Sequence, residues 1–251
     1  MRGRGFIVLM VFLAVGALAQ PEQARPVRVA RVVDGDTVVL LGSHETVRYL
    51  GVDTPEAGEP FYQAATRINR ALVLRRDVYL ELGHERRDAY GRLLAYLWVK
   101  QEGEWLLVNE ELLRRGVARL YVFWPAEEKY YERFLRAVTL AQVEKRGLWG
   151  KFKEPLSLST VEEDPVLYLT EAVTVAFTAG QVQEAEDGWR AFALGSRYGF
   201  HLLVRPEVWP KLKGEWLVGR TVYASGELRW ERLQEGPFIE VLLPEQLGWG
   251  D

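Results

Sequence analysis

Residues 27–56 read VRVARVVDGDTVVLLGSHETVRYLGVDTPE, and this stretch predicts three strands in immediate succession. Apolar residues alternate through the first run, and a second apolar run begins directly after the turn-forming residues 34–37. Gly42 and Ser43 form the next turn, and the third strand is expected over 46–52. Pro55 ends it, because proline cannot donate to a strand ladder. Strands joined by such short turns indicate a small antiparallel β-barrel.

The chain up to residue 149 continues with helical and strand patterns in turn. We expect helices inserted into the barrel and appended to it, which makes this half mainly β with α. The predicted elements are a helix over 61–76, a strand over 78–82, a hairpin joining 93–99 to 105–108, a helix over 110–115 with Asn109 as N-cap and Gly116 at its end, and a long helix bracketed by Pro125 and Gly147.

A composition change follows this half. Residues 151–165 contain Pro155, several hydroxyl side chains and the acidic run Glu162–Asp164, which predicts a linker. Five short strand patterns with glycine turns then predict a second, smaller acidic β domain over 166–251, with a weak likeness to an OB-type barrel. The five patterns span 172–178, 190–194, 199–204, 218–229 and 237–243.

Composition narrows the possible chemistry. The 251 residues include three histidines and no cysteine, which excludes disulfides, thiolate zinc sites, iron–sulfur clusters and a cysteine nucleophile. Acid–base and metal chemistry must therefore rest on carboxylates. The net charge of −3 is unevenly spread: residues 20–155 carry 22 basic and 20 acidic side chains, whereas residues 156–251 carry 8 and 15. A polyanion would bind the first part more readily.

Residues 1–19 have the features of a secretory signal peptide. Arg2 and Arg4 make the start cationic, the 14 residues from 6 to 19 carry no charge, and Ala17-Leu18-Ala19 has the small-x-small form of a cleavage site. A membrane span needs about 20 apolar residues, so cleavage after Ala19 is favoured over a permanent anchor. The chain is expected to be secreted or extracytoplasmic, with membrane contact only if this segment is kept.

Three segments place acids and arginines at predicted strand ends, where a polar cluster has no packing purpose. Each segment alone would be interpreted as a turn, whereas the three together suggest a catalytic site. Two carboxylates and a backbone carbonyl suit a hard cation such as Ca²⁺, which takes about 6–8 oxygens including water. Arginine forks fit phosphate oxygens, and a third carboxylate can accept a proton from water. This combination favours phosphodiester hydrolysis. The segments are residues 34–37, 48–56 and 88–92.

In order and spacing, these residues resemble the staphylococcal nuclease (thermonuclease, micrococcal nuclease) family over about residues 27–149. The resemblance implies an OB-like five-stranded barrel with three helices over residues 20–150, one Ca²⁺ ion, and cleavage of DNA and RNA to leave 3′-phosphate ends. The matching stretches are Val33–Thr37, Arg48–Glu56, Asp88–Tyr96, Val108–Glu110, Gly116–Ala118 and Gly147–Trp149.

The resemblance also implies a role for individual side chains. The phosphate clamp would stabilise the charge that develops during cleavage. The implied assignments are Ca²⁺ binding by Asp36, Asp53 and the carbonyl of Thr54, general-base or water-positioning action by Glu56, a phosphate clamp of Arg48 and Arg92, and nucleotide contacts from Tyr90, Tyr121 and Phe123.

The sequence also departs from the family pattern. Ala89 stands where the best-known member has a lysine, and Phe123 stands where it has a tyrosine. The loop 57–60 after Glu56 is short and lacks the lysines of the longer family loop. The catalytic set is complete, whereas the grip on the substrate is expected to differ.

A secreted Ca²⁺-dependent endonuclease is therefore predicted, acting on DNA and RNA. The alternative is a catalytically weak module that binds nucleic acid or protein on the same fold. For the second domain, we expect a protein or intramolecular contact, because its acidic charge opposes phosphate binding. Its indole rings are then expected in a core or interface. They belong to Trp189, Trp209, Trp216, Trp230 and Trp249.

Overall fold

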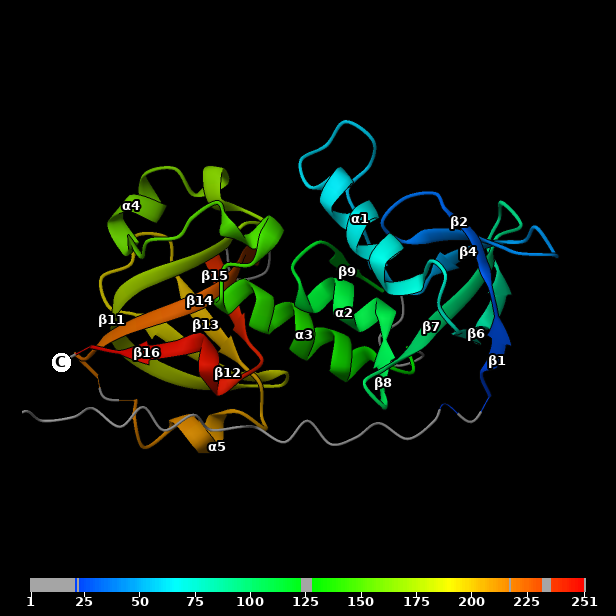
Figure 1. The fold of residues 1–251 in the computed structure, drawn as a ribbon. Coiled ribbons are helices and arrows are strands. Elements are labelled where there is room, and N and C mark those ends of the chain that lie inside the picture. Colours follow the sequence, from blue (N-terminus) through cyan, green and yellow to red (C-terminus); the bar gives the residue numbers. More distant parts are fainter. Residues whose placement is uncertain (1–20, 22, 123–127, 217, 232–235, 251) are drawn as a thin grey trace, which may run out of the picture.

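The computed structural model describes residues 21, 23–122, 128–216, 218–231 and 236–250 (Figure 1). The expected signal segment 1–19, Phe123 and the expected helix start at Pro125 lie outside these residues. Within the described part of the chain, no helix is long and apolar enough to cross a membrane.

The first sheet is nearly closed into a barrel. Its strand order is β1-β6-β7-β4-β3-β2, and β1 and β2 are separated in the chain by Arg28 alone, so the two ends of the order meet. Neighbours are antiparallel except β4 and β7. The chain is thus mainly β with helices, as expected for an OB-like fold. The strands are β1 (Arg25–Val27), β2 (Val29–Val32), β3 (Thr37–Leu40), β4 (Thr46–Tyr49), β6 (Val78–Arg87), β7 (Leu93–Gln101) and β8 (Glu104–Leu107), which pairs with β7.

The third expected strand, over 46–52, is broken into two. Gly51 has a φ of +73°, and a Cβ atom there would lie 2.3 Å from the ring of Phe134. Only glycine combines this left-handed conformation with so close an approach. The chain therefore leaves the barrel sheet, and β5 (Gly51–Asp53) pairs with β9 (Arg119–Tyr121).

Three helices accompany the barrel: α1 (Tyr62–Val73), α2 (Val108–Arg114) and α3 (Tyr131–Val143). Their apolar faces contribute Ala65, Leu112 and Phe134 to the barrel core. α3 begins later than the expected start at Pro125. It lies between the barrel and a second sheet (Figure 1), and it contacts strands of both.

The second sheet has the same strand circuit as the barrel. Its strands follow the order β11-β12-β13-β15-β14 and return to β11, and the β13–β15 pair is parallel. Residues 156–163, expected in a linker, form β10 (Leu156–Ser157) and α4 (Leu158–Glu163), because Val161 is buried in the second core. The other elements are β11 (Ala172–Ala185), β12 (Gly188–Ala193), β13 (His201–Val204), α5 (Trp209–Leu212), β14 (Thr221–Glu231), β15 (Gly236–Val241) and β16 (Leu247–Trp249).

Indole rings of the second sheet pack mostly against its core. Trp189 stacks on Trp209 with ring centroids 5.2 Å apart, and Trp216 is buried and meets the edge of Trp249. Trp230 is exposed. Such a cluster contributes mainly apolar burial.

The buried amide of Asn109 does not cap a helix, contrary to our expectation. α2 begins at Val108, two residues before the expected start, with Leu107 as N-cap. The Asn109 side chain instead accepts from the N–H of Leu97 at 3.0 Å and donates to the carbonyls of Leu50 and Ala95 at 2.8 and 3.3 Å. It ties α2 to β7 and to the break between β4 and β5.

Replacing this amide should destabilise the fold strongly. Asn109→Ala would remove the side-chain partner of the Leu97 N–H and of the Leu50 carbonyl, whereas the Ala95 carbonyl keeps the N–H of Leu50, so we expect the free energy of unfolding to fall by about 3 kcal/mol. Urea denaturation measures the loss. Gln63→Ala, at an exposed position of α1, is the control and should change stability by less than about 0.5 kcal/mol. Equal effects of the two changes would contradict the bridging role of Asn109.

Candidate active site

The turn between β2 and β3 holds a buried carboxylate, that of Asp36, which is 4% exposed. Its Oδ2 accepts from the backbone N–H of Thr54 at 2.8 Å and from the Thr54 hydroxyl at 2.9 Å. Its Oδ1 accepts from the hydroxyl of Thr37 at 3.1 Å. These bonds join the Asp34–Thr37 turn to the segment after β5.

The guanidinium of Arg48 lies between two carboxylates. Its Nε lies 3.3 Å from Asp36 Oδ1, and one terminal nitrogen donates to Asp53 Oδ1 at 2.8 Å. The other terminal nitrogen donates to the carbonyls of Tyr49 at 2.8 Å and Val52 at 2.6 Å. The Arg48 side chain is 13% exposed. One rigid fork therefore fixes both carboxylates and the bend between β4 and β5.

Negative charge is in excess around this fork. Burial raises the pKa of Asp53, and the charge of Asp36 raises it further, whereas Arg48 lowers it. Burial and the charge of Asp36 also raise the pKa of Asp34 in the same turn. Arg48 contacts the carboxylates of Asp36 and Asp53, and Asp34 lies in the same turn as Asp36, so a cation at this site would relieve the repulsion among them.

The oxygen donors fit a hard cation. Asp53 is half exposed, and the carbonyl of Thr54 accepts no hydrogen bond from the described residues. The described chain has no group of three or more His, Cys, Asp or Glu side chains arranged to hold a metal ion. The site offers two carboxylates and one backbone carbonyl, which suits an ion such as Ca²⁺ that fills its remaining positions with water.

Glu56 lies two residues beyond Thr54 and is exposed. Its backbone N–H donates to Glu59 Oε2 at 2.8 Å. Within the described part of the chain, no donor contacts the Glu56 carboxylate. The residue lines a groove of about 950 Å³ together with Asp53 and Thr54. A carboxylate in this position can accept a proton from a molecule in the groove.

Arg92 and Tyr90 lie in the turn between β6 and β7. The Arg92 Nε donates to Asp88 Oδ2 at 2.6 Å, and its guanidinium lies 5.5 Å from the ring centroid of Tyr90, which is 86% exposed. Although partial burial opposes it, hydrogen bonds from Arg92 lower the pKa of Asp88. Arg48 pairs with Leu94, two residues beyond Arg92, so both arginines start from one face of the sheet. The structure does not bring them into contact.

The two remaining predicted contacts lie near β9. Tyr121 pairs with Gly51 across the β5–β9 ladder and is half exposed. Phe123 is outside the described residues.

Sequence reasoning missed the residues that support the turn at Asp34–Thr37. The hydroxyl of Tyr49 donates to Asn69 Oδ1 at 2.8 Å, and Asn69 Nδ2 donates to the carbonyl of Asp34 at 2.9 Å. Burial raises the pKa of Tyr49 well above its usual range, so its hydroxyl stays protonated. Asn69 lies on the apolar face of α1 with Ala65 and Leu72, and an amide at such a position is the signal that could have revealed it.

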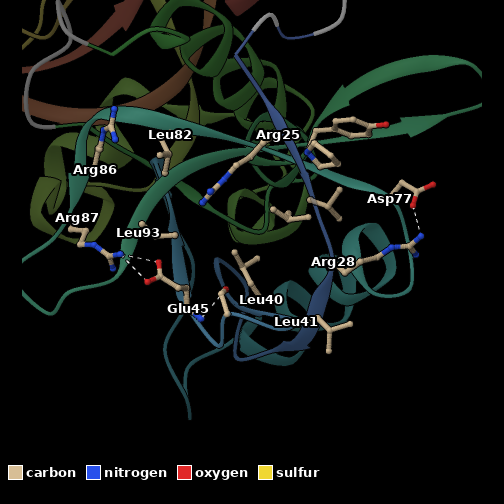
Figure 2. Close-up of a pocket in the computed structure, with 15 residues that line it drawn as sticks. Arg25, Arg28, Leu40, Leu41, Glu45, Asp77, Leu82, Arg86, Arg87 and Leu93 are labelled. Carbon is tan, nitrogen blue, oxygen red and sulfur yellow. Dashed lines mark hydrogen bonds and ion pairs between the residues drawn. The ribbon is translucent and has the colours of Figure 1, made fainter.

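A second hollow, of about 960 Å³, lies on the barrel surface (Figure 2). Arg28 pairs there with Asp77 at 2.7 Å, and Arg87 pairs with Glu45 at 2.8 Å. This hollow shares no lining residue with the groove at Glu56, and it contains none of the predicted site residues. The carboxylate cluster is therefore the better candidate for chemistry.

Comparisons with known proteins find similarity to nucleases. The family model "Staphylococcal nuclease homologue" matches residues 46–151. The thermonuclease of Staphylococcus hyicus is 35% identical over 131 residues, which cover 49% of this chain and 75% of that protein. The SPbeta prophage-derived endonuclease YokF of Bacillus subtilis is 38% identical over 130 residues, 48% of this chain and 43% of YokF. Endonuclease YhcR of B. subtilis is 30% identical over 192 residues, 68% of this chain but 15% of its own length.

The geometry of Arg48 predicts that lysine cannot replace it. A single ammonium group cannot make the four contacts to Asp36, Asp53 and the two carbonyls, so Arg48→Lys should lower the free energy of unfolding by about 2 kcal/mol. Thermal and urea unfolding measure this. Arg31→Lys, at an exposed position on β2, should leave stability unchanged. If both variants unfold like the wild type, the fork does not hold the site together.

Proposed function

Because this chain belongs to the staphylococcal nuclease family, we propose that it is a nuclease that hydrolyses phosphodiester bonds of DNA and RNA with Ca²⁺. One observation carries the proposal: Asp36 and Asp53 are fixed on one guanidinium, and Asp53 shares a groove with the exposed carboxylate of Glu56. Relatives named thermonuclease and endonuclease support this class of reaction.

Each side chain has a defined task in the proposed reaction. Asp36, Asp53 and the Thr54 carbonyl would hold Ca²⁺, which when bound supplies positive charge next to the phosphate. Glu56 accepts a proton from the attacking water. The oxygen of this water forms a bond to phosphorus while the bond from phosphorus to the 5′-oxygen breaks, and the leaving 5′-oxygen takes up a proton from solvent. The products carry a 3′-phosphate and a 5′-hydroxyl.

The arginines bind the phosphate in this scheme. Arg48 is held by carboxylates and carbonyls, so its fork is already oriented before substrate arrives. Arg92 is oriented by Asp88 in the same way. Tyr90 and Tyr121, which are exposed, would contact the nucleotide. These side chains would contact the phosphates and sugars of the nucleic acid rather than the edges of its bases, so low sequence specificity is expected.

Export is part of the proposal and rests on residues 1–19 alone. Sequencing the amino terminus of protein recovered outside the cytoplasm tests it, with Gln20 as the expected first residue. A first residue of Met1 would contradict cleavage.

The activity itself is tested by product analysis. Incubation with single-stranded DNA, duplex DNA and RNA should give fragments with 3′-phosphate ends in Ca²⁺ and no fragments in excess chelator. Fragments of equal yield in chelator would exclude the metal site. Binding without cleavage in Ca²⁺ would instead favour the binding-module alternative.

A Glu56→Gln substitution tests the proposed base. The amide keeps the size of the side chain but cannot accept a proton, so kcat should fall by about a hundredfold or more, with little change in KM. Steady-state kinetics on one oligonucleotide separate the two constants. Glu85→Gln removes the same charge at an exposed position of β6 and should leave both unchanged. Identical kinetics for the two variants would remove Glu56 from the mechanism.

A further inference from the structure

The groove at Glu56 has two walls of different origin. Asp53, Thr54 and Glu56 form one wall. The segment that follows α3 forms the other, with Lys145, Gly147, Leu148, Gly150, Lys151 and Lys153. This second wall lies beside the C-terminal sheet, because the Lys145 ammonium donates to the carbonyl of Ala172 at 3.2 Å. The groove therefore ends on the part of the chain that joins the two sheets.

Basic side chains gather on this second wall. Lys145, Lys151 and Lys153 line the groove together with the carboxylates of Asp53 and Glu56. Lys151 pairs with Glu171 at 2.6 Å, whereas Lys153 is exposed and has no ion pair within the described residues. Residues 156–251 are acidic, with 8 basic and 15 acidic side chains, so this basic wall contrasts with the sheet behind it.

The two exposed lysines are anchored by the aromatic residue between them. Phe152 packs against Tyr168 with ring centroids 5.1 Å apart and belongs to the edge of the second core. Lys151 and Lys153 flank it in the chain, so their backbone is fixed while their ammonium groups remain at the groove.

The backbone conformation and the burial at position 145 both disfavour a lysine. Lys145 follows the last turn of α3 with a φ of 54°, a left-handed conformation in which glycine is preferred. Its side chain is half buried and pairs with no carboxylate of the described residues, and burial lowers its pKa to about 8. The ammonium group lines the groove and also donates to the carbonyl of Ala172.

The loop after Glu56 supplies no such charge. Residues 57–60 are Ala, Gly, Glu and Pro, and they contain no basic side chain. A polynucleotide that places one phosphodiester at Glu56 has further phosphates on either side. Within the same groove, the wall after α3 supplies three lysines that can meet one of them, and β9 supplies Arg119.

We propose that Lys145, Lys151 and Lys153 form a phosphate-binding subsite for the polynucleotide strand next to the scissile phosphodiester. The proposal rests on the proposed nuclease function and extends it: the junction between the sheets is part of the substrate groove. Lysine contacts to phosphate position a strand without reading its sequence. The subsite therefore favours long substrates over short ones.

The test compares two double variants of the full chain. Lys151→Gln with Lys153→Gln removes two charges from the groove. Lys211→Gln with Lys213→Gln removes two exposed charges at α5 and serves as the matched control. Binding of a 20-nucleotide single strand is measured in chelator, and KM is measured in Ca²⁺ for this strand and for a dinucleotide.

The groove variant should bind the long strand about tenfold more weakly, with a larger rise in KM for the long strand than for the dinucleotide. Because each lost phosphate contact lowers the salt slope for single strands by about 0.7, the slope should fall by about 1.4. The control should match the wild type. Equal losses in both double variants, or wild-type binding in the groove variant, would overturn the subsite.

The outcomes separate this subsite from the proposed function. If the wild type cleaves but the groove variant keeps its affinity and KM, the subsite is wrong and the nuclease proposal stands. If the wild type does not cleave, the nuclease proposal fails, and the binding data in chelator still decide whether these lysines contact the strand.

Lys145 is tested by a separate variant. Lys145→Gly should weaken binding of the long strand while the free energy of unfolding stays equal to that of the wild type or rises, because glycine suits the left-handed conformation. Weaker binding together with a large loss of stability would assign Lys145 a structural role. Unchanged binding would remove it from the subsite.

Discussion

The site depends on the ion pairs that the guanidinium of Arg48 makes with Asp36 and Asp53. Without this guanidinium, Asp36 and Asp53 would carry like charges in a partly buried turn with nothing between them. The same side chain holds the carbonyls of Tyr49 and Val52, and so it also fixes the bend that brings β5 out of the barrel. The amides of Asn69 and Asn109 hold the neighbouring backbone by donating hydrogen bonds to the carbonyls of Asp34 and Leu50, respectively. The positions of the carboxylates thus depend on side chains from β4, α1 and α2 as well as on the turn itself.

Much of this site could be predicted because its residues lie at the ends of adjacent strands. The spacing from Asp36 through Arg48 to Glu56 follows from two short turns. Such turns can be predicted because their residue types are recognisable in the sequence. The break at Gly51 could not be predicted, because it depends on the ring of Phe134 from a distant helix. The role of Asn109 was misread for a similar reason: its three partners come from segments that precede it in the chain and pack only in the folded state. The position of Arg92 follows from the strand register, whereas its pairing with Asp88 is a local contact.

The two sheets share a strand circuit but differ in charge and in surface. In the barrel, the circuit carries the carboxylate cluster near one break in the sheet. In the C-terminal sheet, several indole rings pack against the core instead. The OB-like character of that sheet stays a prediction, supported by the parallel pair β13–β15 within an otherwise antiparallel circuit. α3 contacts both sheets, so the two cores are joined by a helix and not by a free tether.

The pairing of β5 with β9 means that the site can form only late in synthesis of the chain. Asp53 lies opposite Arg119, and β4 pairs with β7, so the short stretch that holds Asp36, Arg48 and Asp53 is completed by strands much later in the chain. During synthesis from the amino terminus, a growing chain would expose these side chains long before their partners existed. Contacts between such distant segments form late and cooperatively. The carboxylate of Asp53 therefore acquires its fixed spacing from Asp36 only after β9 has emerged.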